Sequence, residues 1–353
     1  MSKKIKILIV DDSLLVRKSL AEVFASDDEL EVIGEAIDPY MAAQELRKMA
    51  PDVITLDIEM PKMDGITFLK KLMSQHPIPV VVISTLTQKG TQEALTALEY
   101  GAVEVVAKPK INTKEELLQQ RESLIRIIKS AARANLSRLS LSNSKFKGQQ
   151  AIKQSKQNYE RIPSKELVAI GASTGGTTAL KMILMGLSRL SPAVIVVQHM
   201  PEMFTKQFAD RLDSECEISI KEAQDGDRLY AGTALIAPGN KHMMLKGRSP
   251  NFYVQIMDGP RVNHHKPSID VLFKSVARYA AEKAVGVLLT GMGKDGANGM
   301  LEMKNNGAYN IAQNESTSVV FGMPKEAIRL GAAHEVLPIE KIGNAMLNQR
   351  QSK

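Results

Sequence analysis

Short runs of β-branched apolar residues alternate along this chain with longer amphipathic stretches. The first third contains the runs KIKILIV, DVITL, PVVVIS and VEVVA, separated by stretches with a helical period such as SLLVRKSLAEVFAS and ITFLKKLMSQ. From Leu167 onward, LVAIGA, AVIVVQ, TALIAP and VGVLLTG alternate with helical stretches such as TTALKMILMGLS. Such runs are typical of parallel strands buried between helices. We therefore predict an α/β chain with two doubly wound parallel sheets, the second larger and extended by a hairpin element at NFYVQIMDG.

The length of the chain and a change of composition near its middle indicate two domains. With 353 residues, 44% of them hydrophobic, the chain can bury two substantial cores. The segment from about residue 135 to residue 163 is rich in Ser, Gln, Asn and Lys and poor in large apolar residues, a composition suited to a flexible connection. We predict domains over residues 1–130 and 164–348, joined by a basic linker over residues 131–163.

Basic residues concentrate in and beside the predicted linker. Residues 121–165 carry eleven Lys and Arg against two Glu, an excess larger than the net charge of +7 of the whole chain. A charged run of this kind commonly serves solvation. Contact with an acidic receptor surface, with anionic membrane headgroups or with nucleic acid is the functional alternative. Because the second domain lacks a compact helix-turn-helix pattern with a basic recognition helix, we expect no nucleic-acid partner.

Cysteine content and hydropathy bear on the cellular compartment of the protein. Cys216 is the only cysteine, so the chain can form neither an internal disulfide nor a thiolate metal cluster. No uninterrupted apolar run approaches membrane-spanning length, and the N-terminus enters a strand without a signal-peptide pattern. These features predict a cytoplasmic protein without membrane insertion.

A serine follows the run LVAIGA within the pattern GASTGG. Gly171, Ser173 and Gly175 match the GxSxG nucleophile elbow, in which a sharp turn between strand and helix projects the hydroxyl toward a base. A glycine-rich turn at this place also suits phosphate binding or a tight β-to-α connection. The choice between hydrolysis and these roles therefore depends on whether a partner base exists.

A base and an acid follow two other predicted strands. His199 follows AVIVVQ, and Asp295 lies in the glycine-rich loop after VGVLLTG. In open α/β sheets the ligand cleft lies outside the carboxyl ends of the strands, where residues distant in sequence can meet. We predict that His199 takes the proton of Ser173, that Asp295 orients the imidazole, and that backbone N–H groups near the elbow bind the oxyanion. The order Ser, His, Asp differs from that of α/β-hydrolases, which leaves a different doubly wound hydrolase or a false triad; we favour the hydrolase.

The other histidines differ in how well they could serve as the base. Three of them lie in polar loops punctuated by glycine or proline and compete with His199 for this role: His242, His264 and His265. For His76 and His334 we expect a surface or structural role. Asp270 is expected to be an N-cap or surface residue before the helix VLFKSVARYAAEK.

Charged residues also end the predicted strands of the first domain. Asp11 and Asp12 follow the first strand, Asp57 the second and Lys108 the last. Three carboxylates at one sheet edge repel one another unless a cation lies among them, and Mg²⁺ prefers oxygen ligands. We predict that these carboxylates hold Mg²⁺, that Asp57 accepts a phosphoryl group, and that Lys108 and Ser84 contact that group. The alternative for a single strand-terminal Asp is a helix N-cap.

This constellation resembles a response-regulator receiver domain over roughly the first 130 residues. The resemblance implies that Asp57 is the phosphoacceptor, Asp11 and Asp12 the acidic pocket, Ser84 the switch hydroxyl and Lys108 the lysine that pairs with the phosphoryl group.

Two further positions bear on this resemblance. The backbone carbonyl of Glu59, two residues after Asp57, would join the metal site. Receiver domains often carry an aromatic residue three positions before the lysine, whereas this chain has Val105. This departure argues against signal transmission by an aromatic rotamer.

The second half resembles the chemotaxis-type protein-glutamate methylesterases. The motifs GASTGG, QHMP, APGNKHM and LTGMGKDGA carry this resemblance, and the order receiver-then-esterase is that of the family. It implies a flavodoxin-like receiver and a Rossmann-like methylesterase domain, with Ser173, His199 and Asp295 as catalytic triad and Thr174 and Met292 beside the active site.

The resemblance also implies an activity and partners. It implies hydrolysis of glutamate methyl esters on methyl-accepting chemotaxis receptors to glutamate and methanol, and deamidation of certain receptor glutamines. A chemotaxis histidine kinase would be the phosphodonor, Mg²⁺ would serve the receiver, and the esterase step would need no cofactor.

The sequence is therefore compatible with two classes of function. The first is an esterase regulated by phosphorylation in two-component signalling. The second is a noncatalytic module in which the glycine-rich loops GASTGG and TGMGKDG bind a phosphate or nucleotide and the receiver gates a partner interaction. The second does not explain why a serine and a histidine both end strands, so we favour the first.

Overall fold

The computed structural model divides the chain into two compact units, residues 1–140 and residues 141–353. It describes residues 3–60, 62–85, 87–108, 114–137 and 165–348. Most of the predicted linker, from residue 138 on, lies outside these ranges, so the predicted domain boundaries stay predictions. No helix within the described ranges combines the length and the apolar character needed to cross a membrane.

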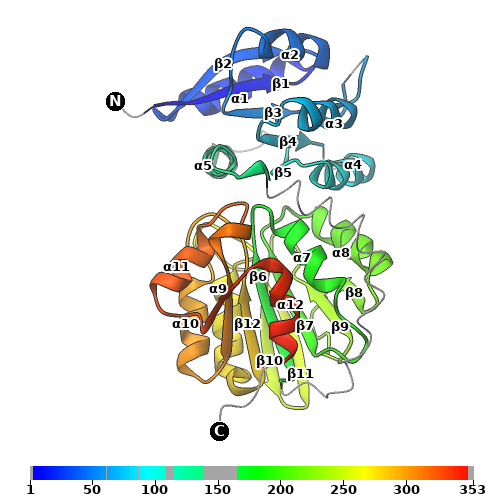
Figure 1. Cartoon of the computed structure of the whole chain (residues 1–353), viewed down its shortest axis with the longest axis vertical. Coiled ribbons are helices and arrows are strands. Elements are labelled where there is room, and N and C mark those ends of the chain that lie inside the picture. Colours follow the sequence, from blue (N-terminus) through cyan, green and yellow to red (C-terminus); the bar gives the residue numbers. More distant parts are fainter. Residues whose placement is uncertain (1–2, 61, 86, 109–113, 138–164, 349–353) are drawn as a thin grey trace. The chain divides into compact units, whose positions relative to one another are not determined.

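The first unit is a five-stranded parallel sheet of order β2-β1-β3-β4-β5. Its helices α1 and α5 contact each other on one face, and α3 and α4 contact each other on the opposite face (Figure 1). The strands are β1 (Ile5–Val10), β2 (Leu30–Ala36), β3 (Val53–Leu56), β4 (Val80–Ser84) and β5 (Glu104–Ala107). The helices are α1 (Leu14–Ala25), α2 (Pro39–Leu46), α3 (Gly65–Gln75), α4 (Gln88–Glu99) and α5 (Lys114–Ala131).

Local sequence explains where these helices begin. Ser13, Asp38, Asp64 and Thr87 each accept a hydrogen bond from a backbone N–H of the first turn that follows. Such side-chain caps satisfy donors that have no partner within the helix. The loops after β1, β2 and β4 therefore pass within three residues into a helix, which keeps their polar residues close to the strand ends.

The second unit is a seven-stranded parallel sheet of order β14-β13-β12-β6-β7-β9-β8, with a separate antiparallel hairpin β10-β11. The predicted hairpin element at NFYVQIMDG is thus confirmed as β11. The strands are β6 (Leu167–Ala172), β7 (Ala193–Gln198), β8 (Ser219–Glu222), β9 (Thr233–Ile236), β10 (His242–Arg248), β11 (Asn251–Met257), β12 (Ala284–Leu288), β13 (Tyr309–Gln313) and β14 (Glu335–Leu337).

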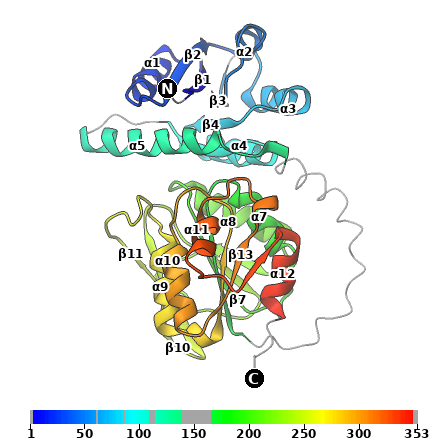
Figure 2. The ribbon, with the colours of Figure 1, turned by 60° about the vertical axis from the view of Figure 1, so that its left-hand side comes forward.

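Helices cover both faces of this larger sheet. Helices α9 and α10 pack against each other on one face, and α7 and α12 pack against each other on the opposite face (Figure 2). The helices are α7 (Gly176–Leu184), α8 (Phe204–Glu215), α9 (Ile269–Tyr279), α10 (Ala297–Asn305), α11 (Met323–Arg329) and α12 (Ile339–Leu347), with short 3₁₀ turns η1 (Ala281–Lys283) and η2 (Glu315–Thr317). The strands β12, β6 and β7 are buried along their whole length. This confirms the predicted fold class of two doubly wound sheets.

Candidate functional site

The order of the strands in the second unit brings the three predicted catalytic residues to neighbouring strand ends. β6 lies between β12 and β7, and the chain winds in opposite directions on its two sides. This is a topological switch point, where loops diverge and leave a crevice at the carboxyl edge. Ser173 directly follows β6 and His199 directly follows β7, while Asp295 lies in the loop between β12 and α10.

Ser173 is held in the turn by its own backbone and by two glycines. Its N–H donates to the Thr290 carbonyl at 3.0 Å, and its side chain is almost buried, with 8% of the residue exposed. Gly175 has φ 76°, in the left-handed region that favours glycine, and is the N-cap residue of α7. A Cβ atom on Gly291 would lie 2.5 Å from Ser173 Cβ. The glycine at position 291 therefore leaves room for the serine.

His199 and Asp295 form a hydrogen-bonded pair. Asp295 Oδ2 and His199 Nε2 lie 2.9 Å apart, although 96 residues separate them in sequence. An ionised carboxylate only accepts hydrogen bonds, so Nε2 carries a proton, and in the neutral imidazole the lone pair is then on Nδ1. Within the described residues, Nδ1 of His199 is buried without a hydrogen-bond partner. This leaves Nδ1 as the ring atom able to act as a base.

No hydrogen bond between the Ser173 hydroxyl and His199 occurs among the described residues. In proteins without substrate, such contacts are commonly long and tighten when substrate binds. The backbone nevertheless fixes both residues, because His199 N–H donates to the Ala172 carbonyl at 3.0 Å and so continues the ladder between β7 and β6. The serine and the base are thus attached to adjacent strands at the same rung.

Asp295 lies in a dense set of hydrogen-bond donors. Its Oδ1 accepts from Asn263 Nδ2 and Ser268 Oγ at 2.9 and 2.8 Å, and its Oδ2 accepts from the Ile269 N–H at 2.7 Å, at the start of α9. Burial by itself raises the pKa of Asp295, but the hydrogen bond and charge of His199 and these donors outweigh it and hold that pKa well below its usual range. Asp295 is therefore an anion that can stabilise a charged imidazolium.

The three competing histidines differ in their surroundings. His242 is buried; its Nδ1 accepts from the Ser268 N–H and its Nε2 donates to the Pro260 carbonyl, so both ring nitrogens are used. His265 is stacked on His199 with ring centroids 3.6 Å apart. His264 is exposed and has φ 70°. Of these, only His265 touches the predicted base.

His334 has the structural role that was expected. Its Nδ1 accepts from the Asn310 N–H at 3.0 Å, and its ring stacks on Tyr309. His76 is exposed and ends α3. Neither histidine belongs to the site.

The expectation that Asp270 is an N-cap or surface residue is wrong. Ser268 is the N-cap of α9, and Asp270 is buried within its first turn. Asp270 accepts from the Gly299 N–H and from Asn263 Nδ2, so Asn263 bridges two carboxylates. Burial, with the charge of Asp295 beside it, raises the pKa of Asp270. The inward position of Asp270 is stabilised by these two donors, one from the loop that precedes α9 and one from α10.

The residues predicted beside the active site belong to the turn after β6 and to the loop between β12 and α10. Thr174 is buried, and its carbonyl accepts from the Thr290 hydroxyl at 3.0 Å. Met292 is half-buried, two residues after Thr290, and its backbone lies against Gly322. Sequence reasoning missed Thr290, which is buried at the end of an apolar run. A polar residue inside such a run is the signal that could have identified it.

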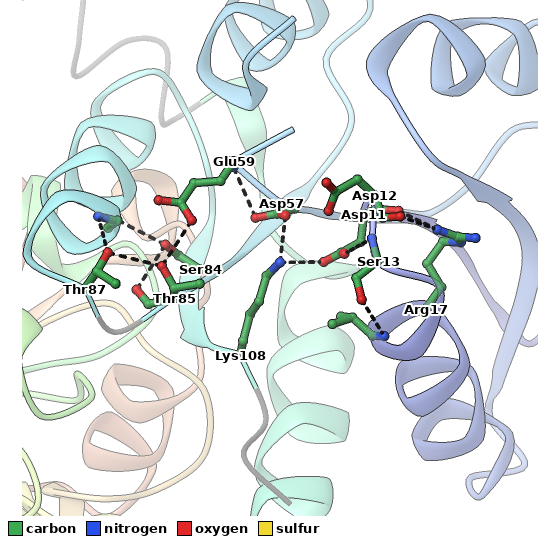
Figure 3. A network of polar contacts seen from close by, with 12 residues as sticks. Asp11, Asp12, Ser13, Arg17, Asp57, Glu59, Ser84, Thr85, Thr87 and Lys108 are labelled. Atoms are coloured by element: carbon green, nitrogen blue, oxygen red, sulfur yellow. Dashed lines mark hydrogen bonds and ion pairs between the residues drawn. The ribbon is translucent and has the colours of Figure 1, made fainter. Parts of the chain in front are cut away.

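The first unit brings its predicted charged residues together at the carboxyl edge of its sheet. Lys108 Nζ lies 2.7 Å from Asp57 Oδ2 and 3.0 Å from Asp11 Oδ2 (Figure 3). Asp11, Asp12 and Asp57 each offer one carboxylate oxygen, and these oxygens lie within 4.8 Å of one another. The neighbouring residue Arg17 is buried and donates to the carbonyls of Asp11 and Asp12. Arg17 was not predicted, and it holds the acidic turn in place.

Burial and charge set the ionisation of this site. Burial raises the pKa of Asp57 to about 6, with a further rise from the charge of Asp11 and an opposing effect of Lys108. The two carboxylates in turn raise the pKa of Lys108, although burial opposes this. An all-oxygen donor set in which the carboxylates crowd one another fits a hard divalent cation such as Mg²⁺.

The other predicted receiver residues surround this cluster. Ser84 is buried, and its hydroxyl donates to the Gly90 carbonyl in α4 at 3.0 Å. The Glu59 N–H donates to Asp57 Oδ1, and the Glu59 side chain accepts from the Thr85 hydroxyl (Figure 3). Val105 is buried in β5. Ser84 is thus bonded to the first turn of α4 and does not contact Asp57 in this structure.

The two units together define a class of protein. A 2-1-3-4-5 parallel sheet with a lysine-bridged acidic edge is the architecture of a phosphoacceptor domain, and the larger sheet presents an elbow serine beside a histidine–aspartate pair. The chain is a hydrolase joined to a receiver.

Comparisons with known proteins specify the family. The family model "CheB methylesterase" matches residues 168–346, and the model "Response regulator receiver domain" matches residues 7–121. The chain belongs to the CheB methylesterase family and carries an N-terminal receiver domain.

Relatives share this organisation over nearly their full length. A protein of Geobacter metallireducens named protein-glutamate methylesterase/protein-glutamine glutaminase 3 is 51% identical over 98% of this chain and 99% of its own. One of Anaeromyxobacter dehalogenans, named protein-glutamate methylesterase/protein-glutamine glutaminase 5, is 52% identical over 98% of this chain and 97% of its own. The crystal structure of the Thermotoga maritima CheB methylesterase catalytic domain is 40% identical, with a TM-score of 0.51, and covers 52% of this chain and 98% of that one.

Proposed function

We propose that this chain hydrolyses γ-methyl esters of glutamate on methyl-accepting chemotaxis receptors, under control of phosphorylation at Asp57. The observation that carries the proposal is the hydrogen bond between His199 and Asp295 at the strand end adjacent to Ser173. The family membership supports the substrate class, because relatives are named protein-glutamate methylesterases. A module that only bound phosphate would not need a buried carboxylate oriented on a histidine.

The acylation step uses Ser173 as nucleophile and His199 as base. The Ser173 Oγ forms a bond to the ester carbonyl carbon while its proton passes to Nδ1 of His199. Asp295 stabilises the imidazolium that results, through the hydrogen bond to Nε2. When the tetrahedral intermediate collapses, the bond to the methoxy oxygen breaks and His199 returns the proton to it. Methanol leaves, and a γ-glutamyl ester of Ser173 remains.

The deacylation step reverses these roles. His199 takes a proton from water, whose oxygen attacks the acyl carbon, and the proton then returns to Ser173 Oγ as glutamate is released. A receptor glutamine would react in the same way, with ammonia as the leaving group. Backbone N–H groups at the elbow, beside Thr174 and Met292, would stabilise the oxyanion.

In the receiver unit, Asp57 would accept the phosphoryl group from a chemotaxis histidine kinase. Asp11, Asp12, Asp57 and the backbone carbonyl of Glu59 would hold Mg²⁺, which when bound neutralises charge on the transferring phosphoryl oxygens. Lys108, now between Asp57 and Asp11, would pair with the phosphoryl group.

The response to phosphorylation would begin at Ser84. Its hydroxyl is bonded to the Gly90 carbonyl, so turning toward a phosphoryl group on Asp57 breaks that bond and frees the first turn of α4. Because position 105 in β5 is valine, it supplies no aromatic ring for this change. The phosphoryl group can raise the activity only by favouring one of two arrangements of the chain.

Methanol release from methylated receptor fragments tests the proposal. We would compare the intact chain, Ser173→Ala and the control Ser219→Ala, whose serine lies exposed on the edge strand β8. Each protein would be assayed with and without a small-molecule phosphodonor and Mg²⁺. We expect release that requires Ser173, is unaffected in Ser219→Ala, and rises with the phosphodonor.

A fluorophosphonate probe separates the chemistry from the substrate. It should label the intact chain and Ser219→Ala, but not Ser173→Ala. Folded protein that neither reacts with the probe nor releases methanol would refute the esterase. Ser173-dependent release that ignores the phosphodonor would leave the esterase in place and refute control by the receiver.

A further inference from the structure

Gln198 connects the two strand ends that carry the proposed nucleophile and base. Its side chain is buried, with 1% of the residue exposed. Its Nε2 donates to the Ser173 carbonyl at 3.0 Å and to the His199 carbonyl at 3.1 Å. The amide therefore bridges the first residue after β6 and the first residue after β7.

This bridge stands where the sheet ladder ends. The register pairs Ala172 with Gln198, and the His199 N–H donates to the Ala172 carbonyl as the last rung. Beyond it the chain after β6 turns sharply into α7, and the Ser173 carbonyl also accepts from the Gly176 N–H at 2.7 Å. Buried carbonyls need donors, and the Gln198 side chain supplies two hydrogen bonds where the backbone of β7 no longer can.

The orientation of this amide is fixed by its surroundings. Both contacted groups are carbonyl acceptors, so the NH₂ group must face them and Oε1 must point away. Among the described residues, Oε1 of Gln198 has no hydrogen-bond partner although it is buried. A buried acceptor without a partner lowers the stability of the fold. This cost indicates that the Gln198 amide has a role besides stabilising the fold.

A glycine makes room for the bridge. Any Cβ atom on Gly176 would overlap Gln198 Oε1, and it would lie 2.7 Å from Ala172 Cβ. The glutamine of QHMP and the last glycine of GASTGG thus form one packed pair, although 22 positions separate them in the sequence. This packing explains why position 176 is a glycine, although the GxSxG pattern ends at Gly175.

We infer that Gln198 is a positioning residue that sets the spacing between Ser173 and His199; this inference rests on the proposed function. It does not touch the substrate. It ties the backbone of the nucleophile to the backbone of the base, so that the Ser173 hydroxyl and His199 Nδ1 meet when substrate binds. A displacement of about 1 Å in such a geometry can cost roughly 100-fold in rate.

The test compares Gln198→Met with a matched control, Asn310→Leu. Asn310 is also buried, donates from Nδ2 to two carbonyls, those of Met300 and Ala332, and has an unpaired Oδ1 within the described residues. A Cβ atom on Gly286 would lie 2.5 Å from that Oδ1. Asn310 therefore repeats the arrangement, but it lies near the start of β13, away from the carboxyl edge.

Three quantities would be measured on the full chain: the rate of fluorophosphonate labelling, the kcat and KM for methanol release, and the thermal midpoint. Both variants should lose thermal stability to a similar degree. We expect Gln198→Met to be labelled about 10- to 100-fold more slowly, with kcat reduced and KM unchanged, because the nucleophile is misplaced and ground-state binding is not. We expect Asn310→Leu to be labelled at the rate of the unmodified chain.

Each outcome decides the inference. Folded Gln198→Met that is labelled at the unmodified rate overturns it, as does an equal slowing in both variants, which would show a general structural effect. If Gln198→Met does not fold, Gly176→Ala, which displaces the carboxamide from the other side, takes its place with the same expectation. Failure of the unmodified chain to be labelled at Ser173 would instead remove the proposed function, and this inference with it.

Discussion

The imidazole rings of His199 and His265 lie face to face, with centroids 3.6 Å apart and planes 7° from parallel. His265 belongs to the loop before α9, which also supplies Asn263 and Ser268 to Asp295. One loop therefore covers the ring of the proposed base and fixes the carboxylate bound to it. The stacking on His265 and the hydrogen bond with Asp295 together restrict rotation of the His199 imidazole.

Replacement of His265 tests whether it acts by stacking or as a base. An aromatic pair contributes roughly 0.5–1.5 kcal/mol beyond its buried area, so His265→Ala should lower kcat by about threefold to tenfold. His265→Phe keeps the stack and should retain most of the methanol release. If His265→Phe were as inactive as Ser173→Ala, His265 and not His199 would be the base.

Removal of the charge of Asp295 should abolish most of the chemistry. In Asp295→Asn the amide no longer fixes the proton on Nε2 of His199, and we expect kcat to fall on the order of 10³- to 10⁴-fold. Labelling by a fluorophosphonate should fall in parallel. Asp270→Asn is the comparison, because Asp270 is equally buried and shares Asn263 but does not contact His199. Equal losses in both variants would contradict the assignment of Asp295.

Protonation of Asp295 should lower the free energy of unfolding of the chain at acid pH. Its pKa in the folded chain lies below the unfolded value of about 4, so its contribution to stability is complete above about pH 4 and is lost as pH falls through the folded value. Urea unfolding followed from pH 5 to pH 2 should therefore show a steeper loss for the unmodified chain than for Asp295→Asn. Parallel curves would contradict this.

A methyl group at position 291 should displace the nucleophile. It would lie 2.5 Å from both Ser173 Cβ and Met323 Cε, so Gly291→Ala should lower the free energy of unfolding by about 1–3 kcal/mol and slow the labelling of Ser173. A methyl group on Gly343, within α12, would meet no atom of the described residues within 4 Å, so Gly343→Ala should raise stability by about 0.5–1 kcal/mol and leave labelling unchanged. Normal labelling of Gly291→Ala would show that the turn can relax.

Phosphorylation should depend on Asp57 and on a divalent cation. We expect Asp57→Asn to incorporate no acid-labile phosphate from a small-molecule donor and to lose the donor-dependent rise of methanol release. Asp64→Asn, which removes only the charge of the exposed residue that caps α3, should behave like the unmodified chain. Chelation of Mg²⁺ should abolish incorporation. Phosphate on Asp57→Asn would place the phosphoacceptor elsewhere.

Cys216 should be slow to alkylate in the folded chain. Burial, with the charge of Glu215 adding to it, raises the pKa of the Cys216 thiol to about 12. At pH 8 the thiolate fraction would then be about a thousandfold lower than in the unfolded chain, where the pKa is about 8.5. Mass spectrometry of iodoacetamide reactions in buffer and in urea would measure this difference. Similar rates in both would contradict the burial of the thiol.

Periodicity and composition were enough to predict the strands and the residues that follow them. β6 and β7 coincide with LVAIGA and AVIVVQ, because β-branched apolar runs bounded by glycine or polar residues have few other stable conformations in a buried sheet. Once the strands are parallel, their carboxyl ends share one edge, so Ser173 and His199 were expected on the same edge of the sheet. The family motifs then indicated the chemistry of that edge.

Only the tertiary structure decided which atoms of these residues meet. Nothing local shows that Asp270 folds inward, that Asn263 joins it to Asp295, or that Gln198 bridges two carbonyls. The contacts of Asn263 with Asp295 and of Gln198 with Ser173 join segments distant in sequence, and all of these contacts depend on the direction of a side chain within a packed interior. Sequence periodicity specifies which face of a strand is buried; the partners of a buried polar group are specified only when the strands have been ordered and the loops closed around them.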